Sequence, residues 1–232
     1  MDFEQLAKIE NLSERVNTTY DIFNEDARLN HSKAARVEFL TTVHYIEKYL
    51  KDGDKILDIG AGAGEYSLYF ARKGYEVSAL ELADANIAAF KKKLTPEDKI
   101  DLVQGNALDL SRYADKSFDI VLLFGPLYHL KNEFGYDVNY FRNGDYDKET
   151  FKLNDFPFVF HTVGAARKLL ADGGINILHE VASDGASELL AARINEMSDE
   201  DYTQYLRYHF YICEKPELLG MTNHLLFMGE KK

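Results

Sequence analysis

A glycine-rich segment at residues 57–64 shows the clearest chemical pattern in the sequence. It reads Leu-Asp-Ile-Gly-Ala-Gly-Ala-Gly, a short apolar run followed by three glycines at alternate positions. Glycine lets the backbone turn sharply and approach a ligand closely, and free amides at the start of a following helix can meet polar ligand groups. We therefore expect a nucleotide-like ligand beside this loop.

Acidic residues near the loop indicate which kind of nucleotide binds. Glu81 closes a second apolar run, 21 positions after Gly60. A carboxylate there can accept hydrogen bonds from both hydroxyls of a ribose, each worth about 1.5–3 kcal/mol. A dinucleotide site requires a further glycine where this chain has Glu65, so the spacing argues against a nicotinamide cofactor. For Glu81 alone, a solvent-exposed strand end is the alternative interpretation.

Short apolar runs alternate with helical stretches around these residues. Gly74 and Pro96 follow the two helical stretches, and Asp84 can cap the second, so the helix stop and start signals agree with the periodicity. Such alternation predicts an α/β fold, a Rossmann-like, doubly wound, mostly parallel sheet with helices on both faces. The predicted strands are 56–59, 76–80, 100–103 and 118–124, and the predicted helices are 65–73 and 84–94.

The flanking regions complete a single predicted domain, 1–232. It comprises an N-terminal helical lid (1–53), a cofactor-binding half (54–130), and a substrate cover with the C-terminal strands (131–232). Nine aromatic residues between 131 and 161 make that stretch too aromatic for a disordered linker. The other expected elements are an amphipathic helix at 33–50, a helix at 162–171, a strand at 175–181, a helical region at 185–212 and a final strand at 224–228.

Composition excludes several classes of function. A net charge of −12 repels nucleic acid phosphates and anionic lipid, and no apolar run approaches the roughly 20 residues of a membrane span. The single cysteine, Cys213, cannot form an internal disulfide, and the first residues lack a secretory pattern. We expect a cytoplasmic protein that acts on a small molecule and binds neither nucleic acid nor membrane. The oligomeric state cannot be predicted.

Four motifs in order resemble those of the class I S-adenosylmethionine-dependent methyltransferases. Residues 57–64 look like the family's motif I, and Leu80-Glu81 looks like its acidic ribose-binding position. Residues 105–110 resemble the adenine loop, and residues 118–130 resemble the fourth strand with its loop. The ending Gly-Pro-Leu-Tyr-His-Leu is similar to a subgroup of small bacterial methyltransferases. The resemblance implies S-adenosyl-L-methionine as the cofactor.

Carried over by position, the resemblance implies a set of cofactor-binding residues. Many relatives have Asp where this chain has Asn106, but an amide oxygen can still accept from the adenine amino group. The implied set is Gly60, Ala61 and Gly62 at the methionine end, Asp58 before them, Glu81 and Leu82 at the ribose, Asn106 and Ala107 at the adenine, and Phe124 and Gly125 beside the methyl group.

Residues 20–29 look like the lid that such enzymes fold over the cofactor. The resemblance implies that Tyr20 faces the sulfonium or the carboxylate and that Arg28 neutralises the carboxylate. The alternative is a helix that packs Ile22, Phe23 and Leu29 on the core, and both interpretations can hold together.

The expected reaction is methyl transfer to a small-molecule acceptor by in-line displacement, in which alignment and exclusion of water matter most. His129 and Tyr128 are the candidates to take a proton from the acceptor, with a structural role as the alternative. The remaining histidines, His224 among them, show no metal-ligand spacing, so no metal is expected.

One departure from the family concerns the number of strands. The family usually has seven, whereas this sequence predicts six, and the aromatic stretch stands where a fifth strand is expected. We interpret the chain as one strand-helix unit short, which makes a non-catalytic S-adenosylmethionine or S-adenosylhomocysteine binder, or a variant without turnover, the alternative function. A nicotinamide-dependent oxidoreductase and a scaffold domain are further alternatives, against which Glu65 and the pair Asp58 and Glu81 argue, respectively.

Overall fold

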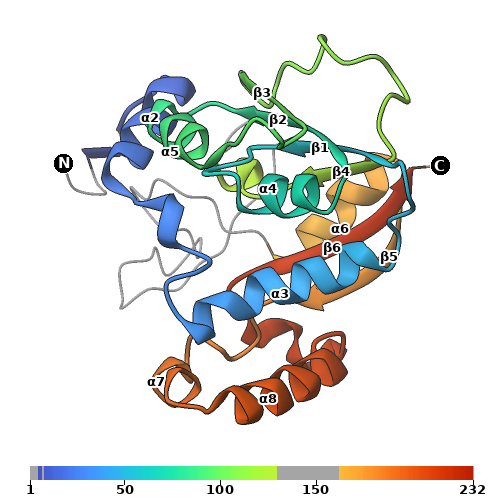
Figure 1. Ribbon diagram of the computed structural model, residues 1–232. Coiled ribbons are helices and arrows are strands. Elements are labelled where there is room, and N and C mark those ends of the chain that lie inside the picture. The colour runs from blue at the N-terminus through green and yellow to red at the C-terminus, as the bar shows by residue number, and fades with distance from the viewer. Residues whose placement is uncertain (1–4, 7, 130–161, 232) are drawn as a thin grey trace. The chain divides into compact units, whose positions relative to one another are not determined.

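The chain folds into two units, one around a parallel sheet and one around an antiparallel pair of strands. The structure, a computed structural model, describes residues 5–6, 8–129 and 162–231 (Figure 1). Unit 1 comprises residues 1–26 and 51–166, and unit 2 comprises residues 27–50 and 167–232. The predicted single domain with its three parts stays a prediction.

Four strands form the parallel sheet of unit 1. They are β1 (Lys55–Ile59), β2 (Glu76–Glu81), β3 (Ile100–Gln104) and β4 (Ile120–Leu123). Their order is β3-β2-β1-β4, and every neighbouring pair is parallel. The predicted α/β fold class and these four strands are confirmed, although β4 is shorter than the predicted run.

Two helices pack on one face of this sheet. They are α4 (Glu65–Arg72) and α5 (Asp84–Lys93). Leu68 of α4 and Phe90 of α5 meet Ala79 of β2 in one buried cluster. Complete burial of a side chain as large as Phe90 contributes about 1.5–3 kcal/mol. The opposite face carries a second cluster, formed by Leu57, Ile59 and Leu80 with Val103, Ala107, Tyr113 and Phe118 packed against it.

An N-terminal helix belongs to unit 1 and contacts α5. This helix, α2 (Leu12–Ile22), begins after Asn11, whose side chain accepts from the backbone of Glu14. The side chain of Asn17 accepts from the backbone N–H of Asp84 at 3.0 Å, at the start of α5. A short 3-10 helix, η1 (Glu25–Ala27), follows at the boundary between the units.

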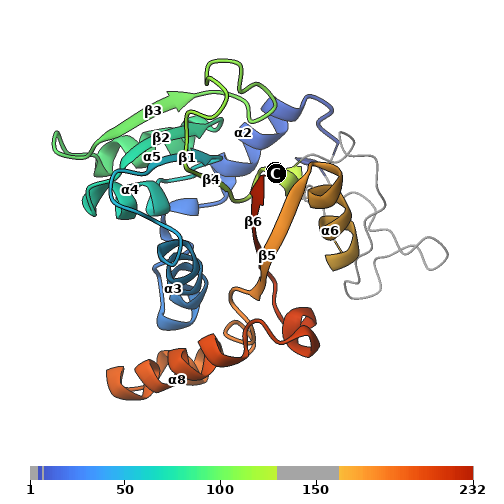
Figure 2. The same cartoon turned by 90° about the vertical axis from the view of Figure 1, so that its right-hand side faces the viewer.

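Unit 2 is built on the antiparallel strands β5 (Ile175–Ala182) and β6 (Leu225–Lys231), which run side by side (Figure 2). The preceding helix α6 (Val163–Asp172) crosses the boundary between the units. Val181, Ile194 and Tyr45 are buried in unit 2, the last on α3 (Lys33–Glu47). The predicted helix at 33–50 is confirmed as far as Glu47.

The predicted helical region at 185–212 is interrupted. The structure has α7 (Ala191–Asn195) and α8 (Asp199–Ile212), and a 3-10 helix, η3 (Pro216–Met221), follows them. Ser198 ends the continuity because its hydroxyl accepts from the backbone N–H of Asp201 at 3.1 Å and so caps α8. Three acidic residues at the start of α8 suit the positive end of the helix dipole.

Several predictions fall outside the described part of the chain. The aromatic stretch 131–161 lies there, and so does the place of the strand-helix unit interpreted as missing. Both therefore stay predictions. Among the helices that the structure describes, none has the length and apolar character to cross a membrane.

Candidate functional site

The carboxyl ends of β1 and β4 lie where the order of the strands reverses. From β1 the chain continues through β2 and β3 on one side, whereas β4 pairs with β1 on the other. Ligands of open α/β sheets bind at the carboxyl ends of the strands at such a reversal. Residues 60–64 follow β1 and residues 124–129 follow β4, so both predicted loops lie at this edge.

Three glycines shape the loop after β1. Gly60, Gly62 and Gly64 all have positive φ angles, of 76°, 56° and 86°. A Cβ atom on Gly60 would lie 2.5 Å from Cγ of Pro126, and one on Gly64 would lie 2.4 Å from the ring of Phe90. Two of the glycines are therefore needed for packing as well as for conformation, and Gly60 brings the loops after β1 and β4 together.

Hydrogen bonds hold this loop against the end of β2. The N–H groups of Gly60 and Ala61 both donate to the carbonyl of Leu80, at 2.7 and 3.1 Å. The N–H of Gly62 donates to Oε2 of Glu81 at 2.7 Å. The loop thus keeps a fixed position relative to the predicted ribose-binding carboxylate.

Glu81 is buried and accepts several hydrogen bonds. Its Oε1 atom accepts from the backbone of Ala83 at 2.8 Å and from the side chain of Asn86 at 3.4 Å. Burial raises the pKa of Glu81, and the hydrogen bonds from Ala83 and Gly62 oppose that rise. A carboxylate offers about four lone-pair positions, and the bond from Asn86 is the longest of its described hydrogen bonds, so it is the one that a ligand hydroxyl can most readily replace. The alternative of a solvent-exposed strand end is wrong, since only 5% of Glu81 is exposed.

Asp58 lies inside unit 1, on β1. Its exposed fraction is 1%, and its Oδ2 atom accepts from the hydroxyl of Ser67 on α4 at 2.6 Å. Burial raises the pKa of Asp58 to about 6, and the charge of Glu81 acts in the same direction. The geometry gives Asp58 a role in fixing α4 relative to β1, next to the loop that begins at Gly60.

The residues predicted for the adenine end follow β3 and β2. The side-chain oxygen of Asn106 accepts from the backbone N–H of Leu108 at 2.9 Å and so stabilises its own loop. Ala107 packs on the cluster of Leu57, Ile59 and Leu80. The carbonyl of Leu82 accepts from Nε2 of Gln104 at 3.2 Å, a bond between the segments after β2 and β3.

Aromatic side chains accompany the segment after β4. The ring of Phe124 lies 4.9 Å from that of Tyr66 of α4, centroid to centroid. Gly125 has a φ of 97°, and a Cβ atom there would lie 2.8 Å from the hydroxyl of Tyr128. The glycine therefore allows this hydroxyl to approach the backbone at the end of β4.

The structure brings three predicted site residues together. The hydroxyl of Tyr20 lies 3.1 Å from the hydroxyl of Tyr128 and 3.1 Å from Nε2 of His129. Burial raises the pKa of Tyr20 well above its usual value, and the neighbouring Tyr128 adds to the rise. Tyr20 is thus a neutral hydroxyl that links the N-terminal helix to the segment after β4.

Arg15 is a further residue of this cluster that the sequence did not indicate. It is buried on α2, and its guanidinium donates to the backbone carbonyl of His129 at 3.1 Å and to that of Ile9 at 3.0 Å. Burial lowers the pKa of His129 to about 4, and the charge of Arg15 contributes. His129 is therefore a neutral imidazole at pH 7. An arginine in an amphipathic helix gives no sign that its partner lies 114 residues away.

The segment predicted as a lid has its own attachments to unit 1. Lys93 of α5 forms ion pairs with Asp26 at 2.6 Å and with Glu65 at 2.7 Å. Glu25 lies close to the glycine loop, because a Cβ atom on Gly62 would be 3.4 Å from its Cγ atom. Glu25 and Asp26 therefore lie beside the loop and the helices that follow it, and the lid itself stays a prediction.

The alternative interpretation of residues 20–29, one helix packed on the core, is wrong, because α2 ends at Ile22. Leu29 is buried, but Ile22 is 50% exposed and Phe23 is 37% exposed, so these two do not pack on the core. Arg28 belongs to unit 2, where it pairs with Glu38 of α3 at 2.7 Å. Its expected role at the cofactor carboxylate stays a prediction.

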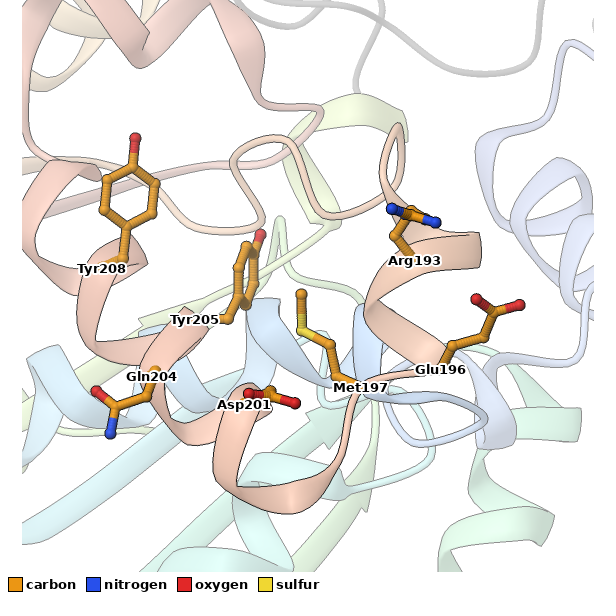
Figure 3. Close-up of a pocket in the computed structure, with 7 residues that line it drawn as sticks. All are labelled: Arg193, Glu196, Met197, Asp201, Gln204, Tyr205 and Tyr208. Atoms are coloured by element: carbon orange, nitrogen blue, oxygen red, sulfur yellow. The ribbon is translucent and has the colours of Figure 1, made fainter.

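Unit 2 contains a pocket between α7 and α8, with a volume of about 600 Å³. Figure 3 shows its side chains, of which Arg193 and Glu196 come from the α7 side and Tyr205 and Tyr208 from α8. Tyr208 is 60% exposed. The remaining lining residues are Met197, Asp201 and Gln204. The pocket offers aromatic surface together with charges of both signs.

Comparisons with known proteins identify the segment that carries the loops described above. Residues 57–136 match a family described as "Methyltransferase domain". The match begins in β1 and includes the glycine loop, Glu81, the loop after β3 and the segment after β4. The predicted methyltransferase motifs are confirmed at this level. The narrower bacterial subgroup stays a prediction.

Curated relatives are methyltransferases with different acceptors. The 27-O-demethylrifamycin SV methyltransferase of Amycolatopsis mediterranei is 28% identical over 68% of this chain. The demethylmenaquinone methyltransferase of Clavibacter sepedonicus is 27% identical over 47% of the chain. The 23S rRNA (uracil(747)-C(5))-methyltransferase of Pyrococcus abyssi is 32% identical over 31% of the chain. The chain spans 60%, 42% and 15% of the lengths of these relatives, in the same order.

Solved structures share the fold. The [4+2]-cyclase SpnF has a TM-score of 0.59 with this chain at 16% identity, and the match covers 94% of this chain and 96% of SpnF. The PH0226 protein of Pyrococcus horikoshii has a TM-score of 0.52 at 20% identity, covering 70% of this chain and 92% of that protein. Residues 57–136 thus match a methyltransferase domain, and the chain shares the α/β fold of these two solved structures.

Proposed function

We propose that unit 1 binds S-adenosyl-L-methionine and that the protein transfers its methyl group to a small-molecule acceptor by in-line displacement. The observation that carries this proposal is the position of Glu81. It is a buried carboxylate at the end of β2, bonded to the N–H of Gly62 in the glycine loop. Both residues lie in the segment that matches methyltransferase domains.

The residues after β1, β2 and β3 suit the parts of this cofactor. In the proposal, Gly60, Ala61 and Gly62 line its methionine end, because positive φ angles expose the backbone there. Glu81 accepts from the ribose hydroxyls, which take the place of its longest contact, the 3.4 Å bond from Asn86. Leu82, Asn106 and Ala107 flank the adenine, and Asp58 supports the loop through Ser67.

Methyl transfer depends chiefly on alignment and on the exclusion of water. The bound sulfonium supplies an electrophilic methyl group, so the chain's own residues have to place the acceptor and manage its proton. Phe124 and Gly125 are proposed to lie beside the reacting carbon, with Tyr128 next to Gly125. Tyr20, held between Tyr128 and His129, is proposed to cover the site and to complete a hydrogen-bonded path between them.

His129 and Tyr128 are proposed to receive the acceptor's proton. With a pKa of about 4, His129 is a neutral imidazole at pH 7 and a weak base, and its Nε2 atom lies 3.1 Å from the hydroxyl of Tyr20. The arrangement therefore suits an acceptor whose nucleophile loses its proton readily. Replacement of His129 by Gln should lower kcat and leave the affinity for S-adenosylmethionine unchanged. If His129 had only a structural role in the fold, kcat would not be lowered selectively.

We propose a small molecule as the acceptor because the chain carries a net charge of −12, which opposes RNA binding. Relatives act on small molecules and on ribosomal RNA alike, to judge from their names. The helices at 185–212 are proposed to contribute to the substrate cover. The stretch 131–161 is proposed to complete the cover.

A specific observation favours a second candidate function, binding without methyl transfer. A structure named as a [4+2]-cyclase matches 94% of this chain, so the fold by itself does not determine methyl transfer. A protein that binds S-adenosylmethionine or S-adenosylhomocysteine without turnover, or a variant that has lost turnover, would have the same site in unit 1.

Calorimetric titration with S-adenosylmethionine, S-adenosylhomocysteine and NAD in parallel tests the proposal. We expect the first two to bind with micromolar affinity and NAD to give no signal. Transfer of a labelled methyl group to compounds of an acceptor panel then separates the enzyme from the non-catalytic binder. Silence from all three ligands would contradict both candidate functions, and binding of NAD alone would indicate an oxidoreductase.

A further inference from the structure

A second cluster of polar side chains lies in unit 2, away from every residue assigned to the cofactor. Asp184, Glu188 and His224 each place one potential ligand atom within 4.8 Å of the others. In the described part of the chain, no other group of three such residues meets this condition. The antiparallel register that pairs Ala182 of β5 with Leu225 of β6 explains the meeting, because it brings the residues just beyond both strands side by side.

The ring nitrogen of His224 faces carboxylates from two directions. Its Nδ1 atom lies 2.9 Å from Oδ2 of Asp184 and 3.4 Å from Oε2 of Glu38, which α3 supplies. Asp184 is buried, while His224 is 41% exposed at its side chain. The carboxylates of Asp184 and Glu188 thus converge with this imidazole, and Arg28, paired with Glu38, is the permanently positive neighbour among the described contacts.

Independent evidence for a ligand comes from Ser187. Its exposed fraction is 0%, and its hydroxyl has no hydrogen-bond partner among the described residues. Ser187 lines a cavity of about 240 Å³ together with Asp184, Glu188, His224 and residues of α3. A buried hydroxyl without a partner is rare in folded proteins, because its hydrogen bonds to water are lost and not replaced. An occupant that carries bound water would give this hydroxyl a partner.

We propose that Asp184, Glu188 and His224 form a binding site for a divalent transition-metal ion of the Zn²⁺ type. A site with an imidazole nitrogen among its ligands suits zinc and its first-row neighbours, whereas Mg²⁺ and Ca²⁺ prefer oxygen ligands throughout. The ion takes the place of the proton between His224 and its carboxylate neighbours. It would join the ends of β5 and β6 to the turn before α7, and the proposal does not depend on the methyl-transfer site.

The sequence could not indicate this site. Asp184 and Glu188 are separated by a helix-like interval of four residues, but His224 follows Asp184 by 40 residues. Only the pairing of β5 with β6 brings the histidine to the two acids. The expectation that no histidine of this chain is a metal ligand therefore rested on spacing along the sequence alone.

Equilibrium dialysis of the full chain against ZnCl₂, after treatment with a chelator, tests the proposal. We expect one Zn²⁺ per chain, with affinity reduced at least about tenfold in Glu188→Gln and in His224→Gln, and by about tenfold in Ser187→Ala. The matched control is His179→Gln, since His179 of β5 also pairs with a carboxylate, that of Glu214 at 3.0 Å. This control should bind Zn²⁺ as the wild type does.

Two further readouts keep the result independent of methyl transfer and of misfolding. Circular dichroism shows whether each variant is folded, and Glu188 is exposed, so its replacement should leave the fold intact. Co²⁺ in place of Zn²⁺ should give a visible absorption band in the wild type that Glu188→Gln weakens. Absence of stoichiometric Zn²⁺ binding by the folded wild type would overturn the proposal, and so would equal affinities in the wild type and in folded Glu188→Gln and His224→Gln.

Discussion

Replacement of Glu81 by Gln is the perturbation that separates ribose binding from the fold most sharply. The amide has the size of the carboxylate but carries no charge, and one of its two acceptor oxygens becomes a donor. In the protein, Oε2 accepts from the N–H of Gly62 at 2.7 Å and Oε1 accepts from that of Ala83 at 2.8 Å. One of these backbone N–H groups would therefore face an NH₂ group in the variant.

The size of the effect follows from these contacts. A hydrogen bond to a charged group contributes about 1.5–3 kcal/mol and a neutral one about 0.5–1.5, so two ribose hydroxyls lose about 2–3 kcal/mol together. That loss corresponds to about 30- to 150-fold weaker binding of S-adenosylmethionine. The unpaired backbone N–H lowers the free energy of unfolding by about 1–3 kcal/mol in addition. Glu81→Ala should weaken binding at least about tenfold for the same reason.

Calorimetric titration with S-adenosylhomocysteine, accompanied by urea unfolding, measures both effects. The matched control is Glu76→Gln, at the other end of β2, where the carboxylate is exposed and lies 3.7 Å from Nζ of Lys55. It should leave the affinity unchanged and the free energy of unfolding within about 0.5 kcal/mol of the wild type. Wild-type affinity in folded Glu81→Gln would refute the assignment of Glu81 to the ribose.

Three other predictions follow from the same site. Gly62→Val should abolish binding of S-adenosylhomocysteine in calorimetry, because the valine side chain fills the space beside the loop. Gly53→Val is the control: Gly53 has a φ of 88°, so the substitution causes similar backbone strain, but a Cβ atom there has no other atom within 4 Å. This variant should still bind. Asp58→Asn should gain stability relative to the wild type as pH rises from about 4 to about 6 and keep that gain at higher pH, because the unfolded carboxyl (pKa about 3.8) ionises over this range while the buried carboxyl, with its pKa raised to about 6, stays protonated. If Asp58 does not titrate between pH 4 and 8, thermal melts over this range would show a constant difference in melting temperature between the variant and the wild type. Lys93→Ala removes two ion pairs and should weaken cofactor binding by less than about tenfold, whereas the exposed Lys91→Ala should have no effect in the same titration.

The elements around β1 could be predicted from the sequence because local signals agree there. Alternating glycines, a buried run before them and Gly74 after α4 place the strand, the loop and the helix within a few residues of their observed ends. The burial of Glu81 could not be predicted, since it depends on Gly62 and Ala83 folding around the end of β2. A strand end is exposed or buried according to its neighbours in space.

Long-range contacts account for most of what the sequence did not reveal. Arg15 reaches the carbonyl of His129, and Tyr20 reaches its imidazole, across more than 100 residues. The break before α8 is a different case, because Ser198 followed by acidic residues is a recognisable cap. The helical pattern of the residues on both sides of this cap nevertheless favoured one continuous helical region at 185–212.

The glycine loop and Glu81 together are proposed to hold the nucleoside of S-adenosylmethionine. A crystal structure of the protein with S-adenosylhomocysteine would show whether they do. We predict that both ribose hydroxyls lie within hydrogen-bonding distance of the Glu81 carboxylate, which keeps its bond to the N–H of Gly62. A nucleoside bound elsewhere, or ribose hydroxyls without contact to Glu81, would contradict the claim.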